Sequence, residues 1–143
     1  MPRGEDATHL GNNEAISVRE GITPRRAPTQ SGSPAVRIVA LVYPKLTLLD
    51  IVGPTEVLSW IPGAELIWVA QEKASMRAAP SGLAIQADYT IDDIKEADIL
   101  IVPGGPATRQ LVSDARLTGW IADIHDTTQW TTSVCTGALL LGA

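Results

Sequence analysis

The sequence predicts an α/β fold of the flavodoxin type, a parallel sheet with helices on both faces. Strand patterns alternate with helical patterns along the chain, and such alternation specifies a parallel sheet. Residues 36–43, 64–70 and 97–103 are nearly continuous apolar runs, as expected of central parallel strands. A fourth strand, residues 131–134, leads directly into a sharp turn and a helix.

The composition is that of a globular protein large enough for one domain with a real core. Of 143 residues, 45% are hydrophobic and 19% are charged. The net charge of −5 argues against nucleic-acid binding. No apolar run approaches membrane-spanning length, and no secretory signal is found. The single cysteine excludes an intrachain disulfide and a cysteine-cluster metal site, and it fits a reducing cytoplasm.

Two segments are expected: a disordered tail over residues 1–35 and an α/β domain over residues 36–143. The tail is rich in Gly, Pro, Ser and Asn and shows no sustained period. Arg25 and Arg26 suggest a basic patch or a targeting segment as the alternative. Acidic residues dilute that basic character, so solvated disorder is the favoured interpretation.

Asp50 follows the first strand and is expected to lie before the first helix, at the carboxyl edge of the sheet. That helix is expected to begin at Gly53 and Pro54, since proline is favoured at the first helical position, and to end before Pro62. Open α/β sheets place their sites along this edge. A turn or cap carboxylate is an equally good interpretation of Asp50 from these residues alone.

Further elements are expected between the second strand and the fourth. Residues 76–89 predict an extended or hairpin excursion, and Thr90 with Asp93 predicts the cap of a short helix. Residues 114–126 predict an amphipathic helix whose inward residues are Leu117, Trp120, Ile121 and Ile124.

Gly104 and Gly105 end the third strand at the same edge as Asp50. Bare backbone N–H groups there could face an anion, and a plain tight turn is the alternative. A phosphate-binding loop is not indicated, because the sequence has neither G-x-G-x-x-G nor a following Gly-Lys-Ser/Thr.

Cys135 lies at the junction between the fourth strand and the helix that follows it. Thr136 and Gly137 interrupt the strand pattern, and the start of the helix favours the thiolate. A tight turn would also hold the side chain out of the core, as in a nucleophile elbow. A buried, inert cysteine is the alternative, but the strand–turn–helix context favours a reactive one.

Three motifs, residues 49–58, 101–105 and 133–138, resemble the ThiJ/PfpI family of the class I glutamine amidotransferase-like superfamily. The resemblance covers residues 36–143. Within the family, the chain looks most similar to isonitrile hydratases, and the motifs also occur in the amidotransferase-like domain of AraC-type transcription regulators.

The resemblance implies roles for the residues at the carboxyl edge. Cys135 would be the nucleophile, Asp50 the acidic residue that faces it, and the backbone N–H groups of Gly105 and Thr136 the donors to developing negative charge. Three glycines would have supporting roles: Gly53, Gly104 and Gly137. The family implies a small-molecule substrate, no metal or organic cofactor, and a homodimer.

The sequence departs from the family after the cysteine. Family members continue with further strands and helices, often with a His-containing motif, whereas this sequence ends at Ala143. The fold is therefore expected to be truncated after the elbow, and the chain as given to be inactive. His125 precedes the strand of the cysteine and is expected to be a solvated helix-end residue.

The function implied is the cysteine-dependent hydration of small isonitriles to N-substituted formamides, a lyase activity. Two alternatives stay open: a non-catalytic sensor domain of an AraC-type regulator, and a thiol protein that responds to oxidants or electrophiles. A helix-turn-helix region downstream would favour the regulator, and turnover of an isonitrile would favour the hydratase.

Overall fold

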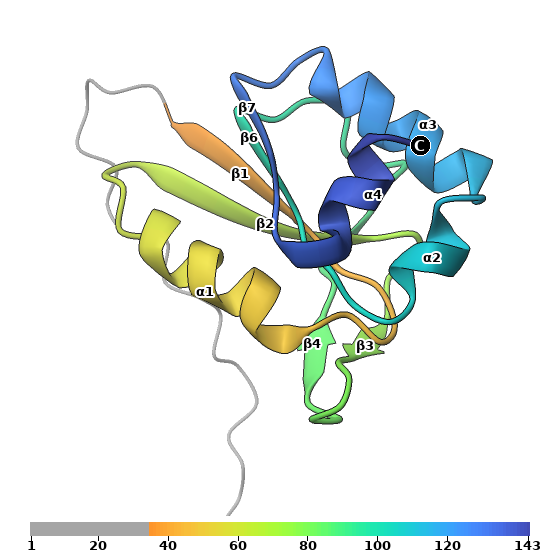
Figure 1. The fold of residues 1–143 in the computed structure, drawn as a ribbon. Coiled ribbons are helices and arrows are strands. Elements are labelled where there is room, and N and C mark those ends of the chain that lie inside the picture. Colours follow the sequence, from red (N-terminus) through yellow and green to blue (C-terminus); the bar gives the residue numbers. More distant parts are fainter. Residues whose placement is uncertain (1–34) are drawn as a thin grey trace, which may run out of the picture.

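The structure is a computed structural model that describes residues 35–143 and confirms the predicted α/β fold (Figure 1). The main sheet has five parallel strands in the order β5-β2-β1-β6-β7. Its strands are β1 Val36–Leu41, β2 Ala64–Ala70, β5 Tyr89–Thr90, β6 Ile99–Val102 and β7 Trp130–Ser133. Apart from its last residue, the tail expected over residues 1–35 falls outside the described part of the chain.

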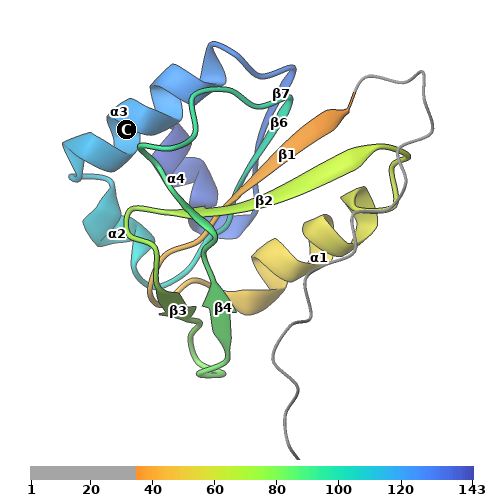
Figure 2. The ribbon, with the colours of Figure 1, turned by 180° about the vertical axis from the view of Figure 1, so that it is seen from behind.

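Helices cover both faces of the sheet (Figures 1 and 2). Helix α1, Leu48–Leu58, lies on one face, and α2 Thr108–Leu111, α3 Ala115–His125 and α4 Ala138–Leu141 lie on the other. This division follows from the strand order, because β1 connects outward to β2 whereas β6 connects outward to β7 in the opposite direction. Right-handed connections in opposite directions place their helices on opposite faces. The carboxyl ends of β1 and β6 therefore form the topological switch point, where open sheets bind ligands.

The core lies on both sides of β1 and β6. Residues 38–42 and 100–102 are completely buried, which explains their uninterrupted apolar runs. The four residues predicted to face inward from α3 are all buried: Leu117, Trp120, Ile121 and Ile124. In the described part of the chain, no helix has the length and apolar character that crossing a lipid bilayer requires.

The predicted start of the first helix was wrong. Helix α1 begins at Leu48, five residues before Gly53, and Pro54 lies inside it. The helix also ends earlier than expected, at Leu58 instead of just before Pro62. Leu46 and Ile51 are completely buried, so packing against the core favours helical backbone earlier than the proline signal indicates. As a result, Asp50 lies within the first turn of α1, where an acidic side chain is favoured by the helix dipole.

The short helix predicted after Thr90 is absent from the structure. Thr90 ends β5, and a turn of residues 91–93 follows. The predicted contact does form: Asp93 Oδ2 accepts hydrogen bonds from the backbone N–H of Thr90 at 2.9 Å and its hydroxyl at 2.7 Å. These hydrogen bonds lower the pKa of Asp93. Ile91 and Ile94 are buried on either side of the turn, so the chain packs there as a turn instead of extending into a helix.

The predicted hairpin excursion is confirmed as an antiparallel pair, β3 Ser75–Arg77 and β4 Ala84–Gln86. It projects beyond the carboxyl end of the main sheet (Figure 1). The N–H of Lys45 donates to Arg77 O at 2.7 Å, and the N–H of Ala79 donates to Leu46 O at 2.8 Å. The hairpin therefore holds the loop between β1 and α1 in place through these two backbone hydrogen bonds.

Asp114 caps the helix that the sequence predicts from this residue. Its Oδ1 accepts from the backbone N–H groups of Arg116 and Leu117, both at 3.1 Å. Its Oδ2 accepts from Gln71 Nε2 at 2.7 Å. The hydrogen bond from Gln71, followed by that from the Leu117 N–H, lowers the pKa of Asp114.

Asp114→Ala should lower the free energy of unfolding by about 1 kcal/mol, the usual effect of losing an N-cap side chain. Urea unfolding followed by tryptophan fluorescence measures it. Because the folded-state pKa is depressed, the contribution of the charge is present at neutral pH and is lost as the pH falls below about 4. Asp114→Asn is the matched control, since it keeps a capping oxygen; equal losses in both variants would contradict the capping role.

Candidate active site

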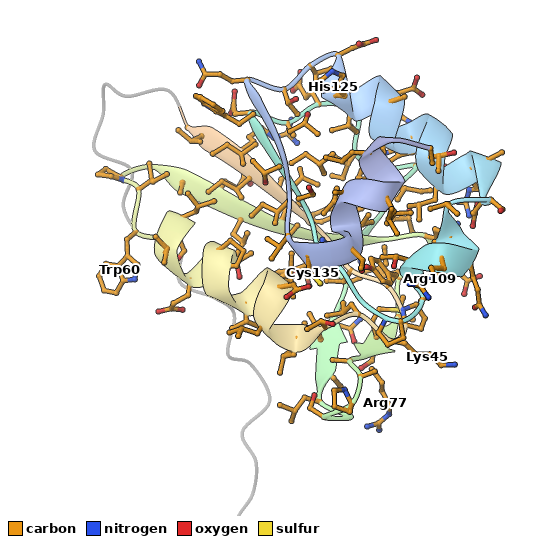
Figure 3. The ribbon with its side chains drawn as sticks, viewed as in Figure 1. Lys45, Trp60, Arg77, Arg109, His125 and Cys135 are labelled. Atoms are coloured by element: carbon orange, nitrogen blue, oxygen red, sulfur yellow. The ribbon has the colours of Figure 1, made fainter. Side chains whose placement is uncertain are left out.

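Cys135 is the first residue of the short 3₁₀ helix η1, Cys135–Gly137, which follows β7 through a sharp turn (Figure 3). Its φ is 55°, a left-handed conformation that side chains other than glycine rarely adopt. Holding such a residue costs about 1–3 kcal/mol, and strain of this kind clusters at functional sites. The thiol is free and the residue is exposed. The predicted junction is therefore confirmed as a sharp turn, and Cys135 itself carries the unusual backbone conformation.

Gly137 lets the turn lie directly on the end of β6. It is buried, and a Cβ at this position would come within 2.8 Å of Pro103 O and still closer to Val102 O. Its φ of −56° is ordinary, so close approach of backbone, not backbone freedom, requires glycine here. Gly137 therefore allows the turn that carries Cys135 to pack directly against the end of β6.

Asp50 lies at the same edge of the sheet as Cys135, but it comes from α1, which covers the face opposite to α4 (Figure 1). Its Oδ2 accepts a hydrogen bond from the Gly104 N–H at 3.2 Å. A Cβ on Gly104 would lie 2.9 Å from Asp50 Oδ2 and 2.7 Å from the Thr136 backbone nitrogen. The Asp50 carboxylate and the backbone of the cysteine turn therefore both pack against Gly104. Any side chain at position 104 would collide with them.

The two predicted backbone donors differ in this structure. The Gly105 N–H donates to Thr136 Oγ1 at 3.0 Å, so it is already engaged within the protein. The buried Thr108 hydroxyl donates to Gly105 O at 2.8 Å and lies 3.1 Å from Thr136 Oγ1. Among the described residues, the Thr136 N–H has no hydrogen-bond acceptor. The arrangement thus leaves Thr136 as the available donor, while Gly105 holds the threonine side chain in place.

Tyr43, which the sequence patterns did not indicate, adjoins the cluster formed by Asp50, Gly104 and the turn at Cys135–Gly137. Its side chain is 3% exposed, and its hydroxyl donates to Pro103 O at 2.6 Å. Burial raises the pKa of Tyr43 well above its ordinary value, and negative charge on Asp50 and Cys135 raises it further. Tyr43 is therefore neutral, and both candidates lie near enough to act on it. Its place just beyond the carboxyl end of β1 is a signal that could have included it.

Gly53, to which the resemblance gives a supporting role, lies outside the cluster, and so does His125, which the sequence predicts to be a solvated helix-end residue. Gly53 is in the middle of α1, and a Cβ there would touch only the Leu49 side chain, at 3.9 Å. His125 ends α3, and its Nδ1 lies 2.8 Å from Thr131 Oγ1 near the start of β7. Figure 3 places His125 and Cys135 at opposite ends of that strand, and His125 is exposed as predicted.

Two cavities flank the described domain. One, of about 300 Å³, is lined by Tyr43 together with Gln71, Glu72 and Arg116, and neither Asp50 nor Cys135 lines it. The other, of about 250 Å³, lies between α3 and α4 and includes Ile121, Leu140 and Leu141. Within residues 35–143, no group of three or more His, Cys, Asp or Glu side chains is placed to hold a metal ion.

The fold and the strained cysteine turn define a class of protein. Residues 36–143 match the DJ-1/PfpI family, and the chain belongs to that family.

Among its relatives is the isonitrile hydratase of Pseudomonas putida, which is 31% identical over 109 residues. The alignment covers 76% of this chain and 47% of that protein, so the chain spans about half the length of this curated relative.

The fold is similar to that of solved structures. A ThiJ/PfpI family protein from Pseudomonas syringae has a TM-score of 0.72 and 30% identity, covering 85% of this chain and 54% of the other. A candidate transcriptional regulator from Vibrio parahaemolyticus has a TM-score of 0.63 and 20% identity, covering 75% of this chain and 60% of the other. The second similarity shows the fold alone.

Proposed function

We propose that this domain hydrates small isonitriles to N-substituted formamides, with Cys135 as the nucleophile and Asp50 as the group that moves protons. The observation that carries the proposal is the exposed Cys135 in its strained turn, with the Asp50 carboxylate held at the neighbouring Gly104. The 31% identity to an isonitrile hydratase supports it. Since the chain covers 47% of that relative, the proposal concerns this domain together with the C-terminal part that the relative carries.

In the first step, Cys135 sulfur bonds to the terminal carbon of the isonitrile. The thiol proton passes through Asp50 to the same carbon, and the product is a thioimidate, R–N=CH–S–Cys. Nucleophilic attack of this kind requires an accessible thiol beside a group that can accept and return its proton. Cys135, at the start of η1, and Asp50, in α1, would meet that requirement.

In the second step, water adds to the thioimidate carbon and a proton reaches the nitrogen. The carbon–sulfur bond then breaks, which releases R–NH–CHO and restores the thiol. Asp50 is placed to take a proton from the water and deliver it to the nitrogen. The Thr136 N–H is the donor available for negative charge on the oxygen added by the water.

No specific contact in the described residues favours the sensor-domain alternative, because the similarity to the transcriptional regulator is limited to the fold. The thiol-response alternative uses the same exposed Cys135 but does not need Asp50. The homodimer and the cytoplasmic location stay predictions.

The test compares residues 36–143 with an extended form, in which the C-terminal half of the P. putida relative follows Ala143. We expect the extended form to convert a simple alkyl isonitrile to its formamide, and the short form to be inactive. Leu139 is 46% exposed, and Leu141, which lines the cavity between α3 and α4, is 36% exposed. The segment after the elbow is therefore only partly covered. A four-residue helix is marginal without such support.

Formamide production, followed by chromatography, distinguishes the alternatives, and Cys135→Ser in the extended form is the control. Equal turnover by the short and extended forms would show that the domain does not need the C-terminal half for activity. A reactive thiol without turnover would favour the thiol-response alternative.

A further inference from the structure

One peptide group at the end of β6 is held from both sides. The carbonyl of Pro103 accepts from the Tyr43 hydroxyl at 2.6 Å, and the N–H of Gly104 donates to Asp50 Oδ2 at 3.2 Å. This carbonyl and this N–H belong to the same planar peptide unit, so they point in opposite directions and turn together. Tyr43 and Asp50 are thus joined through a single rigid group.

We propose that Tyr43 is a positioning residue for Asp50 and acts through the Pro103–Gly104 peptide. The proposal rests on the hydratase function above, in which the Asp50 carboxyl moves protons. It assigns to the buried tyrosine the task of aiming the Gly104 N–H at that carboxyl.

The surroundings of the peptide make it depend on Tyr43. Pro103 is buried, and Tyr43 is the hydrogen-bond donor to its carbonyl oxygen among the described residues. Gly104 has no side chain to restrict its backbone, so its hydrogen-bonding partners contribute more to holding it. A hydrogen bond to the carbonyl also polarises the peptide, which strengthens its N–H as a donor to the carboxylate.

The next peptide is held in the same way, which shows why rotation at Pro103 matters. Gly104 O accepts from the Thr47 N–H at 2.9 Å, while the Gly105 N–H donates to Thr136 Oγ1. The consecutive peptides thus direct one N–H to Asp50 and the next to the cysteine turn. Loss of the Tyr43 hydrogen bond frees the Pro103–Gly104 peptide and so changes the hydrogen bond to Asp50. The Gly104–Gly105 peptide keeps its partners, Thr47 and Thr136.

The first measurement does not need turnover. In nuclear magnetic resonance spectra of the full chain, Tyr43→Phe should move the Gly104 amide proton upfield and speed its exchange with solvent by about tenfold, because its hydrogen bond weakens. Tyr89→Phe is the matched control, since Tyr89 is 47% exposed on β5 and should leave Gly104 unchanged. Asp50→Asn should also shift the resonance of the Gly104 amide proton. This result would identify Asp50 as the acceptor of the Gly104 N–H even if the Tyr43 variant folds poorly.

The second measurement uses turnover by the extended form. Tyr43→Phe should lower kcat about five- to tenfold, the effect of one hydrogen bond, with KM within about twofold. In the double variant Tyr43→Phe/Asp50→Asn, no further loss is expected beyond that of Asp50→Asn, because Tyr43 acts through Asp50.

An unchanged Gly104 amide in Tyr43→Phe, or additive losses in the double variant, would overturn the proposal. If the wild type hydrates no isonitrile but Gly104 still responds to both substitutions, the hydratase function fails while the positioning of Asp50 by Tyr43 stands.

Discussion

Asp50→Asn in the extended form should lower isonitrile hydration by about 10²–10⁴-fold, the usual contribution of a positioned general acid–base group. Asparagine keeps an oxygen that can accept from the Gly104 N–H, at 3.2 Å in the wild type, so the fold should be unaffected. It cannot take up and release a proton in the working range, so both proton transfers of the proposed reaction are lost. Turnover and the rate of Cys135 alkylation are the two measurements.

The thiol should stay open to alkylation in this variant, because Cys135 is exposed and the Asp50 carboxylate accepts its hydrogen bond from Gly104, outside the cysteine turn. Asp123→Asn on the solvent side of α3 is the matched control and should leave both rates unchanged. Retention of most activity by Asp50→Asn would rule out the proton-moving role. Lost stability with little lost activity would instead identify Asp50 as a turn residue.

Gly137→Ala should lower the free energy of unfolding by at least about 3 kcal/mol, at the upper end of what overpacking costs. The added Cβ would collide with the carbonyl oxygens of Val102 and Pro103, which are backbone atoms of the central sheet and cannot turn aside like a flexible side chain. The cysteine turn rests on these atoms, so activity should fall with stability. Urea unfolding of the extended form measures the change.

Gly119→Ala is the matched control for this substitution. Gly119 lies inside α3, and a Cβ there meets nothing within 4 Å. Alanine is favoured over glycine in a helix interior by about 0.5–1 kcal/mol, so this variant should be more stable than the wild type. A loss of less than about 1 kcal/mol in Gly137→Ala would show that the turn can shift away from β6.

The predicted sheet was largely right because burial of whole strands leaves a strong local pattern. The apolar runs of β1 and β6 are explained by strands covered on both faces, whereas β2 is buried only at Ile67 and in its last two residues. The start of α1 was wrong for a related reason. The proline at position 54 suggested a start, but burial of Leu46 and Ile51 outweighed that signal.

The candidate site was predicted only in part. The sequence placed Cys135 and Asp50 at one edge because the strand ends of a parallel sheet share an edge, which is a rule about topology. Sequence spacing does not reveal the hydrogen bonds by which Thr108 and Tyr43 join the candidate site. Gly53 was included through its motif, yet it lies away from the cluster.

Local sequence patterns are enough to predict the strands, the edge at which the motifs meet, and the residue at the strand–helix junction, since apolar runs and turn-forming residues act over a few positions. The pairing of backbone groups with side chains depends instead on the tertiary fold. Those hydrogen bonds join residues far apart in sequence: Tyr43 to Pro103 across 60 positions, Gly104 to Asp50 across 54 and Gly105 to Thr136 across 31. Whether the Gly105 N–H is free or engaged depends on where Thr136 Oγ1 comes to lie, and packing of β6 against β7 and α2 determines that position.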